Sequence, residues 1–497
     1  MMNGKALQRG RIILAGIFFM LVMLAFLGII RAFVPQLQFL PAVLAAHGLV
    51  ILGILILTFF FGRIYCSVIC PLGIWQDIIL WLSRWRKKKR YRFAYRPEKA
   101  VLRYVVLGVT ALAFFAGLTL VPIVLDPYSI FGRTMGQIIT PFYQYGFNGI
   151  AAFSMNQGGF LWESEDIIYK GTEILVVSGI TFLIITFLAW KYGRLYCQTI
   201  CPVGTILGTV SRYNLYGPVF AADQCVSCGI CEKICRSSCI DVKNHRVEYS
   251  RCIDCFDCVA ACPHGAIRFI RKTIPGRITE NEKTPAVPLL SRRDALIRCG
   301  LAAGAVLAAV TRGSLPVLPW GKGKGTIMPP GALSYDQFTQ HCTACQLCSD
   351  RCPSGVLMPA IKEYGMNGIF QPHLDFSKGY CAYNCNFCSQ ACPSGAIHPL
   401  TVQDKQKLVI GKAVYYAFHC IINEQGVECG NCARHCPQGA ITMKEQGDKL
   451  LPVVHHDLCI GCGACQYYCP ANPKAITVRA VTEQHTLGDQ RNHERKS

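Results

Sequence analysis

CVSCGICEKIC, residues 225–235, and CIDCFDCVAACP, residues 252–263, decide the fold of the segment that contains them. Both follow the CxxCxxCxxxC spacing, in which three thiolates of a run bind one 4Fe-4S cluster and the fourth binds its neighbour. The spacing predicts one cluster on Cys225, Cys228, Cys231 and Cys262, and a second on Cys252, Cys255, Cys258 and Cys235. Arg236 stands where the first run would carry proline, and Cys239 follows shortly after, so an exchange of Cys239 for Cys235 remains open.

Four further runs of this kind lie in the C-terminal part, and each ends in Cys-Pro. They are Cys342, Cys345, Cys348, Cys352; Cys381, Cys385, Cys388, Cys392; Cys420, Cys429, Cys432, Cys436; and Cys459, Cys462, Cys465, Cys469. The second carries one extra residue between its first two cysteines and the third carries six. Sequential and nested pairings of the four runs are both compatible with the spacing.

The six runs use 24 of the 30 cysteines. Structural zinc is the competing interpretation of a CxxC pair, but zinc sites use two pairs and do not require this longer spacing. We therefore expect six 4Fe-4S clusters. The formal charge of +21 falls to roughly +9 when each oxidised site is given about −2, and nucleic-acid binding is not expected.

Uncharged apolar stretches occur in the N-terminal half at 12–30, 32–62, 104–125 and 174–190. Each approaches or exceeds the roughly 17–25 residues that cross a bilayer, so four spans are predicted. The loop 63–99 holds ten Lys and Arg residues, whereas 126–173 holds only Arg133 and Lys170. By the positive-inside rule the first loop and the N-terminus are cytoplasmic.

An internal repeat follows the second and fourth of these stretches. GRIYCSVICPLG occupies 62–73 and GRLYCQTICPVG occupies 193–204. An i, i+4 pair places two sulfurs on one helical face. Cys66, Cys70, Cys197 and Cys201 are therefore candidate ligands of a seventh cluster, with a redox dithiol pair or structural thiols as the alternatives.

His47 is the only histidine within the four stretches. An ionisable group at membrane depth is a functional candidate, here for a quinone contact. The alternative is a neutral imidazole bonded to a neighbouring helix carbonyl.

A shorter apolar segment, 299–311, follows Ser291-Arg292-Arg293. The pair of arginines resembles a twin-arginine export signal. We expect this segment to cross the membrane as a fifth span and to remain uncleaved, with a surface helix as the alternative. Cys299 within it is expected to be a packing residue.

The fold class expected is an α-helical membrane bundle joined to α+β ferredoxin-like domains. The units are a membrane domain at 1–205, a cytoplasmic two-cluster ferredoxin at 206–285, a twin-arginine-like segment at 286–318 and a four-cluster domain at 319–497. The location predicted is the bacterial inner membrane, with the C-terminal domain periplasmic.

Positions 1 to about 270 resemble the NapH/MauN-type membrane ferredoxins, on CSVICP, CQTICP, the segment DPYSIFGR at 126–133 and the two-cluster unit. The remainder is similar to the NapG/MauM-type polyferredoxins. The resemblance implies a fusion that acts as a quinol dehydrogenase component, with quinol as donor, lipid and quinone as contacts, and a periplasmic reductase or cytochrome as acceptor.

Two other functions remain open. One is a redox maturation or regulatory factor for a partner metalloenzyme, and the other is a relay subunit fed by a cytoplasmic low-potential donor. The chain has no Walker motif, no GxGxxG after a strand and no CxxCH, so neither nucleotide nor c-type haem is expected.

Overall fold

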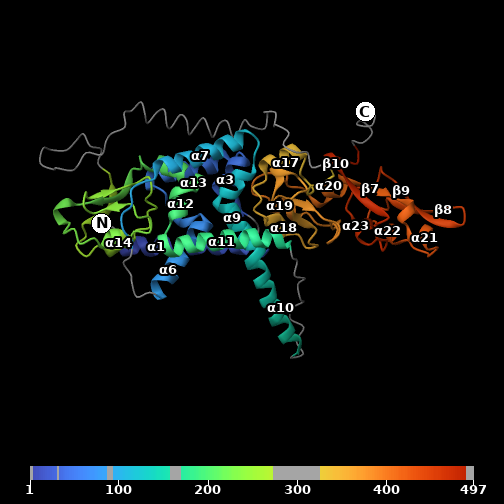
Figure 1. The fold of residues 1–497 in the computed structure, drawn as a ribbon, viewed down its shortest axis with the longest axis horizontal. Helices are drawn as coiled ribbons and strands as arrows, with labels where there is room; N and C mark the ends of the chain where they lie inside the picture. Colours follow the sequence, from blue (N-terminus) through green and yellow to red (C-terminus); the bar gives the residue numbers. More distant parts are fainter. Residues whose placement is uncertain (1–3, 31–32, 87–92, 157–169, 273–324, 489–497) are drawn as a thin grey trace.

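The computed structural model describes residues 4–30, 33–86, 93–156, 170–272 and 325–488. The predicted segment 286–318 and Cys299 lie outside these ranges. Figure 1 shows an elongated molecule with a helical part in the middle and a cluster-type domain at each end.

The helical part is formed by the N-terminal half of the chain. Its elements are α1 (Gly4–Phe26), α2 (Phe33–Gln36), α3 (Phe39–Leu44), α4 (Gly48–Phe61), α5 (Ile64–Val68), α6 (Pro71–Arg86), α7 (Ala100–Phe115), α8 (Leu120–Leu125), α9 (Pro127–Thr134), the π-helical η1 (Met135–Ile139), α10 (Thr140–Asn156), α11 (Thr172–Tyr192), α12 (Leu195–Thr199) and α13 (Pro202–Ser211).

Two of the described helices, α1 and α11, are long and apolar enough to cross a membrane. The other two predicted spans are divided. Residues 32–62 form α2, α3 and α4, with Pro35 and Pro41 in the short pieces, because proline interrupts a helix. Residues 104–125 divide into α7 and α8 near Gly117, whose φ is 84°. Four uninterrupted spans are therefore not confirmed.

The first ferredoxin unit consists of short elements. They are β1 (Tyr216–Phe220), η2 (Ala222–Gln224), α14 (Ile230–Ile234), β2 (Ile240–Asp241), β3 (Arg246–Val247), α15 (Asp257–Ala261) and β4 (Ile267–Arg271). Strands β1 and β4 pair antiparallel, as do β2 and β3.

The C-terminal domain repeats this architecture. Its elements are α17 (Tyr335–His341), α18 (Leu347–Asp350), β5 (Leu357–Pro359), η4 (Met366–Gly368), β6 (Pro372–Leu374), α19 (Phe387–Ala391), α20 (Val402–Lys407), β7 (Leu408–Tyr415), η5 (Ala417–His419), α21 (Ile421–Glu424), α22 (Asn431–Arg434), β8 (Ile441–Gln446), β9 (Lys449–Val454), α23 (Ala464–Tyr467) and β10 (Ile476–Thr486). Its antiparallel pairs are β5 with β6, β7 with β10, and β8 with β9. Ferredoxin-like domains are thus present at both ends.

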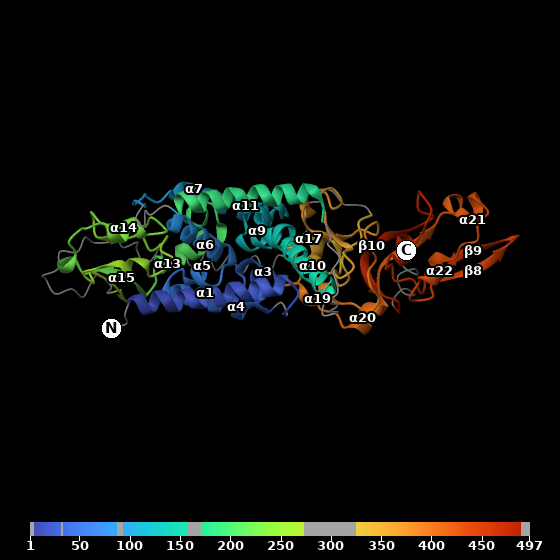
Figure 2. The ribbon, with the colours of Figure 1, turned by 90° about the horizontal axis from the view of Figure 1, so that it is seen from below.

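Helix α1 joins the two ends of the molecule (Figure 2). Near its start, Gln8 donates to Asp257 of the first ferredoxin unit at 2.7 Å. At its end, Arg351 of the C-terminal domain donates from Nε to the Ala25 carbonyl at 2.9 Å. Its 23 residues correspond to roughly 34 Å of helix. The two cluster-type domains are therefore separated by about the length of helix α1.

Candidate iron-sulfur sites

The predicted partners in the first ferredoxin unit lie around two hollows. One is lined by Cys225, Cys228, Cys231 and Cys262. The other is lined by Cys235, Cys252, Cys255 and Cys258, together with Cys239. The structure therefore brings together both sets of four that the spacing predicted. We name the first set the tip site and the second the inner site.

The loops that carry these cysteines have unusual backbone conformations. Ser227 and Asp254, which precede the second cysteine of their runs, have φ of 54° and 49°, and Phe256 follows with 60°. Ala344 and Gln346 flank Cys345 in the same way, at 51° and 63°. Non-glycine residues rarely adopt positive φ, and such strain clusters at functional sites. Successive turn conformations of this kind point backbone N–H groups into one concavity, as in many Fe–S sites.

Cys235 and Cys239 face the same hollow, with their sulfurs 3.5 Å apart. The hydrogen bond from Cys239 lowers the pKa of Cys235 to about 7. The same hydrogen bond, with a second to Cys252 and with burial, raises the pKa of Cys239 well above its usual value. Either sulfur can donate in this contact, so Cys235 as the ligand stays a prediction from the spacing of its run.

We expect Cys239→Ser to retain the inner cluster, because a serine hydroxyl can still donate to Cys235. Cys235→Ser should lose that cluster, which is about four iron atoms per chain. Iron analysis with EPR of the reduced protein measures both. A Cys239→Ser variant that loses four irons while Cys235→Ser keeps them would assign the ligand role to Cys239.

The four C-terminal runs pair sequentially, a point that the spacing left open. Cys420, Cys429, Cys432 and Cys469 line one hollow. Cys436, Cys459, Cys462 and Cys465 line another. In the first two runs, Cys342, Cys345 and Cys348 lie near Cys392, whereas Cys381, Cys385 and Cys388 lie near Cys352.

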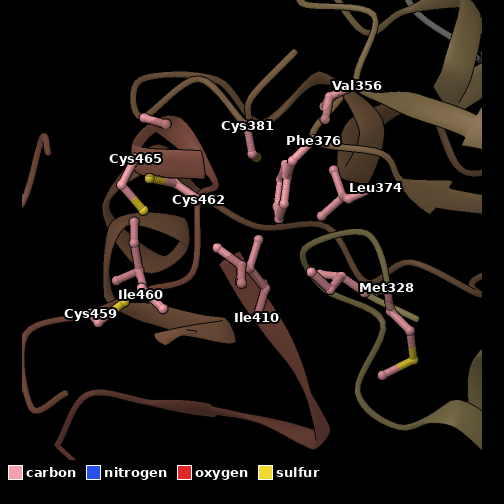
Figure 3. Close-up of a cluster of buried hydrophobic side chains, with 14 of the residues drawn as sticks. Met328, Val356, Leu374, Phe376, Cys381, Ile410, Cys459, Ile460, Cys462 and Cys465 are labelled. Atoms are coloured by element: carbon pink, nitrogen blue, oxygen red, sulfur yellow. The ribbon is translucent and has the colours of Figure 1, made fainter. Parts of the chain in front are cut away.

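The two pairs of runs contact each other directly. The backbone N–H of Cys381 donates to the carbonyl of Cys462 at 2.9 Å. Figure 3 shows Phe376 and Ile410 beside this junction, within one hydrophobic core that both pairs share. The four C-terminal sites are consequently parts of one packed domain.

Cys66, Cys70, Cys197 and Cys201 are brought together between the two ferredoxin parts. All four are buried, at 3 to 5% exposure, in one hydrophobic core. This core also includes Cys255 of the inner site and Cys345 of the C-terminal domain. We name the four cysteines the central site.

The repeat builds the central site with approximate two-fold symmetry. Arg63 donates to the Cys197 carbonyl at 3.1 Å, and Arg194 donates to the Cys66 carbonyl at 2.5 Å. A Cβ on Gly73 or Gly204 would lie 2.3 Å from those same carbonyls. Both glycines are therefore needed for the close approach of the two halves.

Several groups around the central site favour negative charge. Helices α6 and α13 begin at the prolines that follow Cys70 and Cys201, and Gly204 N–H donates to the Cys201 sulfur at 3.3 Å. Helix N-termini stabilise anions. Arg63 is fully buried, with Nη2 3.7 Å from the Cys66 sulfur. No carboxylate among the described residues forms an ion pair with Arg63. Four thiolates holding a cluster would supply the anion that this buried cation lacks.

Arg194 shares a carboxylate with two other cationic side chains. Asp77 accepts from Arg194 Nε at 3.0 Å, and it forms ion pairs with Arg11 at 2.8 Å and Arg236 at 2.9 Å. Arg236 also pairs with Asp257 at 2.6 Å. Burial alone raises the pKa of Asp77, but the three guanidiniums more than offset this and hold the pKa well below its usual value. Arg236 stands where proline was expected after Cys235. Through its ion pairs with Asp77 and Asp257 it links the inner site to the central site.

The sequence did not indicate the contacts that Arg63, Arg194, Arg236 and Asp77 make around the central site. The repeated Gly-Arg before each CxxxC pair was a usable signal for Arg63 and Arg194, but nothing local indicates the partners of Asp77. His47, by contrast, precedes α4 and is exposed. The 14 residues of α4, roughly 21 Å of helix, separate His47 from the central site. Its quinone contact stays a prediction.

On its other side the central site meets the segment 126–139. The Tyr196 hydroxyl donates to the Leu125 carbonyl at 2.8 Å. The Tyr128 hydroxyl approaches the Cys345 thiol, and a Cβ on Gly132 would lie 2.3 Å from the Cys345 carbonyl. Helix α9 is therefore the packed connection between the central site and the C-terminal domain.

The donor sets fit iron-sulfur clusters: thiols in fours that line shared hollows, and strained loops with inward N–H groups. When bound, the clusters would supply one-electron redox chemistry, tuned by hydrogen bonds, charge and burial. The fold and the sites define an iron-sulfur electron-transfer protein.

Comparison with known proteins agrees with this class. A model described as a 4Fe-4S binding domain matches 45–90 and 174–218, which contain the central cysteines. A second 4Fe-4S binding domain matches 246–267, and a 4Fe-4S dicluster domain matches 427–473.

Among similar proteins are ferredoxin-type proteins of methylamine utilization and the Nap system. The protein MauM of Methylorubrum extorquens is 32% identical over 159 residues, 31% of this chain and 71% of MauM. MauM of Paracoccus denitrificans is 31% identical over 202 residues, 38% of this chain and 87% of MauM. NapG of Escherichia coli is 30% identical over 161 residues, 31% of this chain and 69% of NapG. The chain belongs to the family of MauM/NapG-type ferredoxin proteins.

Proposed function

We propose that this chain is a membrane electron conduit that holds seven 4Fe-4S clusters and passes electrons from quinol to an acceptor on the other face of the membrane. The observation that carries the proposal is the linear order of the seven cysteine sets. The tip site adjoins the inner site, the inner site adjoins the central site, and the four C-terminal sites follow along the long axis (Figure 2).

Each step of this order rests on contacts. Cys231 and Cys258 join the tip and inner sites in one core. Arg63 spans the next interval, since it donates to the Ser250 carbonyl at 3.1 Å and reaches Cys66. The Cys381–Cys462 contact joins the two C-terminal pairs.

Four passages of the chain run between the two cluster-type domains. Helix α1 starts at the first ferredoxin unit, and α4 returns toward it, with the Leu215 N–H donating to the Phe59 carbonyl at 2.9 Å. The third passage, α7 with α8, ends where Thr119 donates to the Asn367 carbonyl at 2.5 Å. The fourth, α11, begins near the Lys170–Asp350 ion pair and ends where Arg194 N–H donates to the Arg236 carbonyl at 3.1 Å. This path supports the four predicted crossings despite the breaks in two of them.

The surface of these passages supports a lipid environment. Only 28% of an apolar 18-residue stretch of α1, and 22% of such a stretch of α11, is buried. Exposed apolar side chains include Ile13 on α1, Leu112 on α7 and Leu183 on α11. An apolar surface of this extent is expected to contact membrane rather than water.

Helix α10 supports a membrane interface at the end of the bundle that adjoins the C-terminal domain. It extends sideways from the end of the bundle that adjoins the C-terminal domain (Figure 1). Tyr143 and Tyr145 on this helix are 38% and 53% exposed, and tyrosine side chains are typical of the membrane interface. With the basic loop 63–99 on the cytoplasmic side, the C-terminal domain would lie in the periplasm.

Quinol enters the proposal through the resemblance of the first 270 residues to membrane ferredoxins. It would deliver its electrons near the central site, because that site lies inside the helical part. Menaquinol added to the purified chain should reduce the clusters, followed by EPR, while menadiol tests a donor without the lipid tail. Failure of menaquinol to reduce any cluster between pH 6 and 9 would reject quinol as the donor.

A further inference from the structure

The tip site has no place in a route from the central site to the C-terminal domain. Its contact with the other sites runs through the inner site, by way of Cys231 and Cys258. It lies at the end of the molecule opposite the C-terminal domain (Figures 1 and 2). A cluster at this position conducts nothing unless electrons enter or leave the molecule there.

The tip site is also open to solvent. Cys228 is the exposed cysteine among those described, and Cys225 and Cys262 are half-buried. Val226, between the first two ligands, is 62% exposed. By contrast, Cys235, Cys252, Cys255 and Cys258 of the inner site are all buried. A redox partner can therefore approach the tip cluster closely, but not the inner one.

Basic side chains from several elements lie near this opening. The β2–β3 hairpin lies beside the loop, since Ser227 Oγ is 3.5 Å from His245 Nε2, and this hairpin carries the exposed Lys243 and Arg246. Arg268 donates from Nη2 to Gln224 Oε1 at 2.7 Å. Exposed Lys233 extends its Cε to the neighbourhood of Gly229.

Three acidic side chains lie near these four cations. Asp223 is exposed beside the loop, Glu232 of α14 accepts from the Tyr95 N–H at 2.9 Å, and Asp241 is engaged with Asn244 at 2.7 Å. None of the four cationic side chains forms an ion pair with a described carboxylate; the four are Lys233, Lys243, Arg246 and Arg268. At the opposite tip the balance is reversed, because the segment 417–470 holds five acidic and three Lys or Arg residues. The two ends of the molecule therefore differ in their balance of charged side chains.

We propose that the tip site is a second electron port, at which a soluble acidic iron-sulfur carrier docks; this inference rests on the proposed function as a conduit. Val226 supplies a small apolar centre and the four basic side chains a charged rim, as in transient redox complexes. The reduced carrier loses one electron and the tip cluster gains it. No bond is made or broken and no proton moves. The electron then passes to the inner and central sites.

The test is the rate at which a reduced, acidic 2Fe-2S ferredoxin reduces the full-length chain in detergent, measured by stopped-flow absorbance. The rate constant should fall steeply as salt rises, because complementary charges steer association. Lys243→Glu with Arg246→Glu should lower it about tenfold or more at low salt, and Lys243→Glu alone should lower it by a smaller factor. A matched control is Lys378→Glu with Lys444→Glu, two exposed sites in the C-terminal domain, which should leave the rate unchanged.

Two measurements distinguish failure of the electron port from loss of the tip cluster and from failure of quinol as the donor. Iron content and the EPR signal of the tip cluster should be the same in every variant, and the single Lys243→Glu variant serves if the double variant loses iron. Menaquinol reduction should be unchanged in both charge-reversed proteins. A salt-independent rate, or an equal loss in the control, would overturn the port. Loss of menaquinol reduction with normal carrier kinetics would instead contradict the proposed donor.

Discussion

Cys66→Ser combined with Cys197→Ser is expected to remove one cluster and to interrupt the conduit. Together the two substitutions remove one thiolate from each half of the repeat, so two of the four ligands remain. Iron should fall from about 28 to about 24 atoms per chain, four per cluster. Because the central site lies between the two ferredoxin parts, menaquinol should no longer reduce the C-terminal clusters. Iron analysis and quinol-driven EPR measure the two effects.

The control for this variant is Cys239→Ser, which removes a buried thiol that is not assigned as a ligand. It should keep both the iron and the electron transfer. If the central double variant keeps the iron content of the unmodified chain, the central cysteines hold no cluster. They would then be redox dithiols or structural thiols.

Asp77→Ala should cause the largest loss of stability among single substitutions outside the cysteines. It leaves Arg11, Arg194 and Arg236 buried without their shared carboxylate. Removing one partner from a buried ion pair costs about 3–5 kcal/mol. Thermal unfolding followed by cluster absorbance should show an early transition of the first ferredoxin unit. Asp448→Ala, at an exposed hairpin turn, should leave unfolding unchanged.

The loss of unfolding free energy caused by Asp77→Ala should be constant between about pH 5 and 8. The folded pKa of Asp77 is depressed, so its stabilisation is complete above the unfolded pKa of about 3.9. It is lost only as the pH falls through the lower, folded pKa. A deficit that disappears at pH 7 would show that Asp77 does not hold the arginines as an anion.

The six cysteine runs could be predicted because cluster ligation imposes a fixed local spacing. The pairing of the C-terminal runs could not, because it depends on how α18 packs on α19 and α22 on α23. The repeat predicted that the central cysteines would meet. The roles of Arg63, Asp77 and Arg236 depend on contacts between segments far apart in sequence.

The apolar helices were predicted from hydropathy alone, which does not register where a helix breaks. Pro41 and Gly117 lie within apolar stretches long enough to span, yet the chain turns near them. The breaks have a consequence for the sites. They allow α9 and the central cysteines to approach within the helical part, so that Tyr128 contacts the C-terminal domain.

Electron transfer across a sealed bilayer tests the central claim most directly. The chain would be reconstituted into liposomes that contain ferricytochrome c, and membrane-impermeant dithionite would be added outside. Both orientations of the chain conduct in this assay, so mixed insertion does not obscure the result. We predict reduction of the trapped cytochrome in proportion to the chain present, and its loss in the Cys66→Ser, Cys197→Ser variant. Bleaching of all clusters by external dithionite, with the trapped cytochrome remaining oxidised, would place both cluster domains on one face and contradict the conduit.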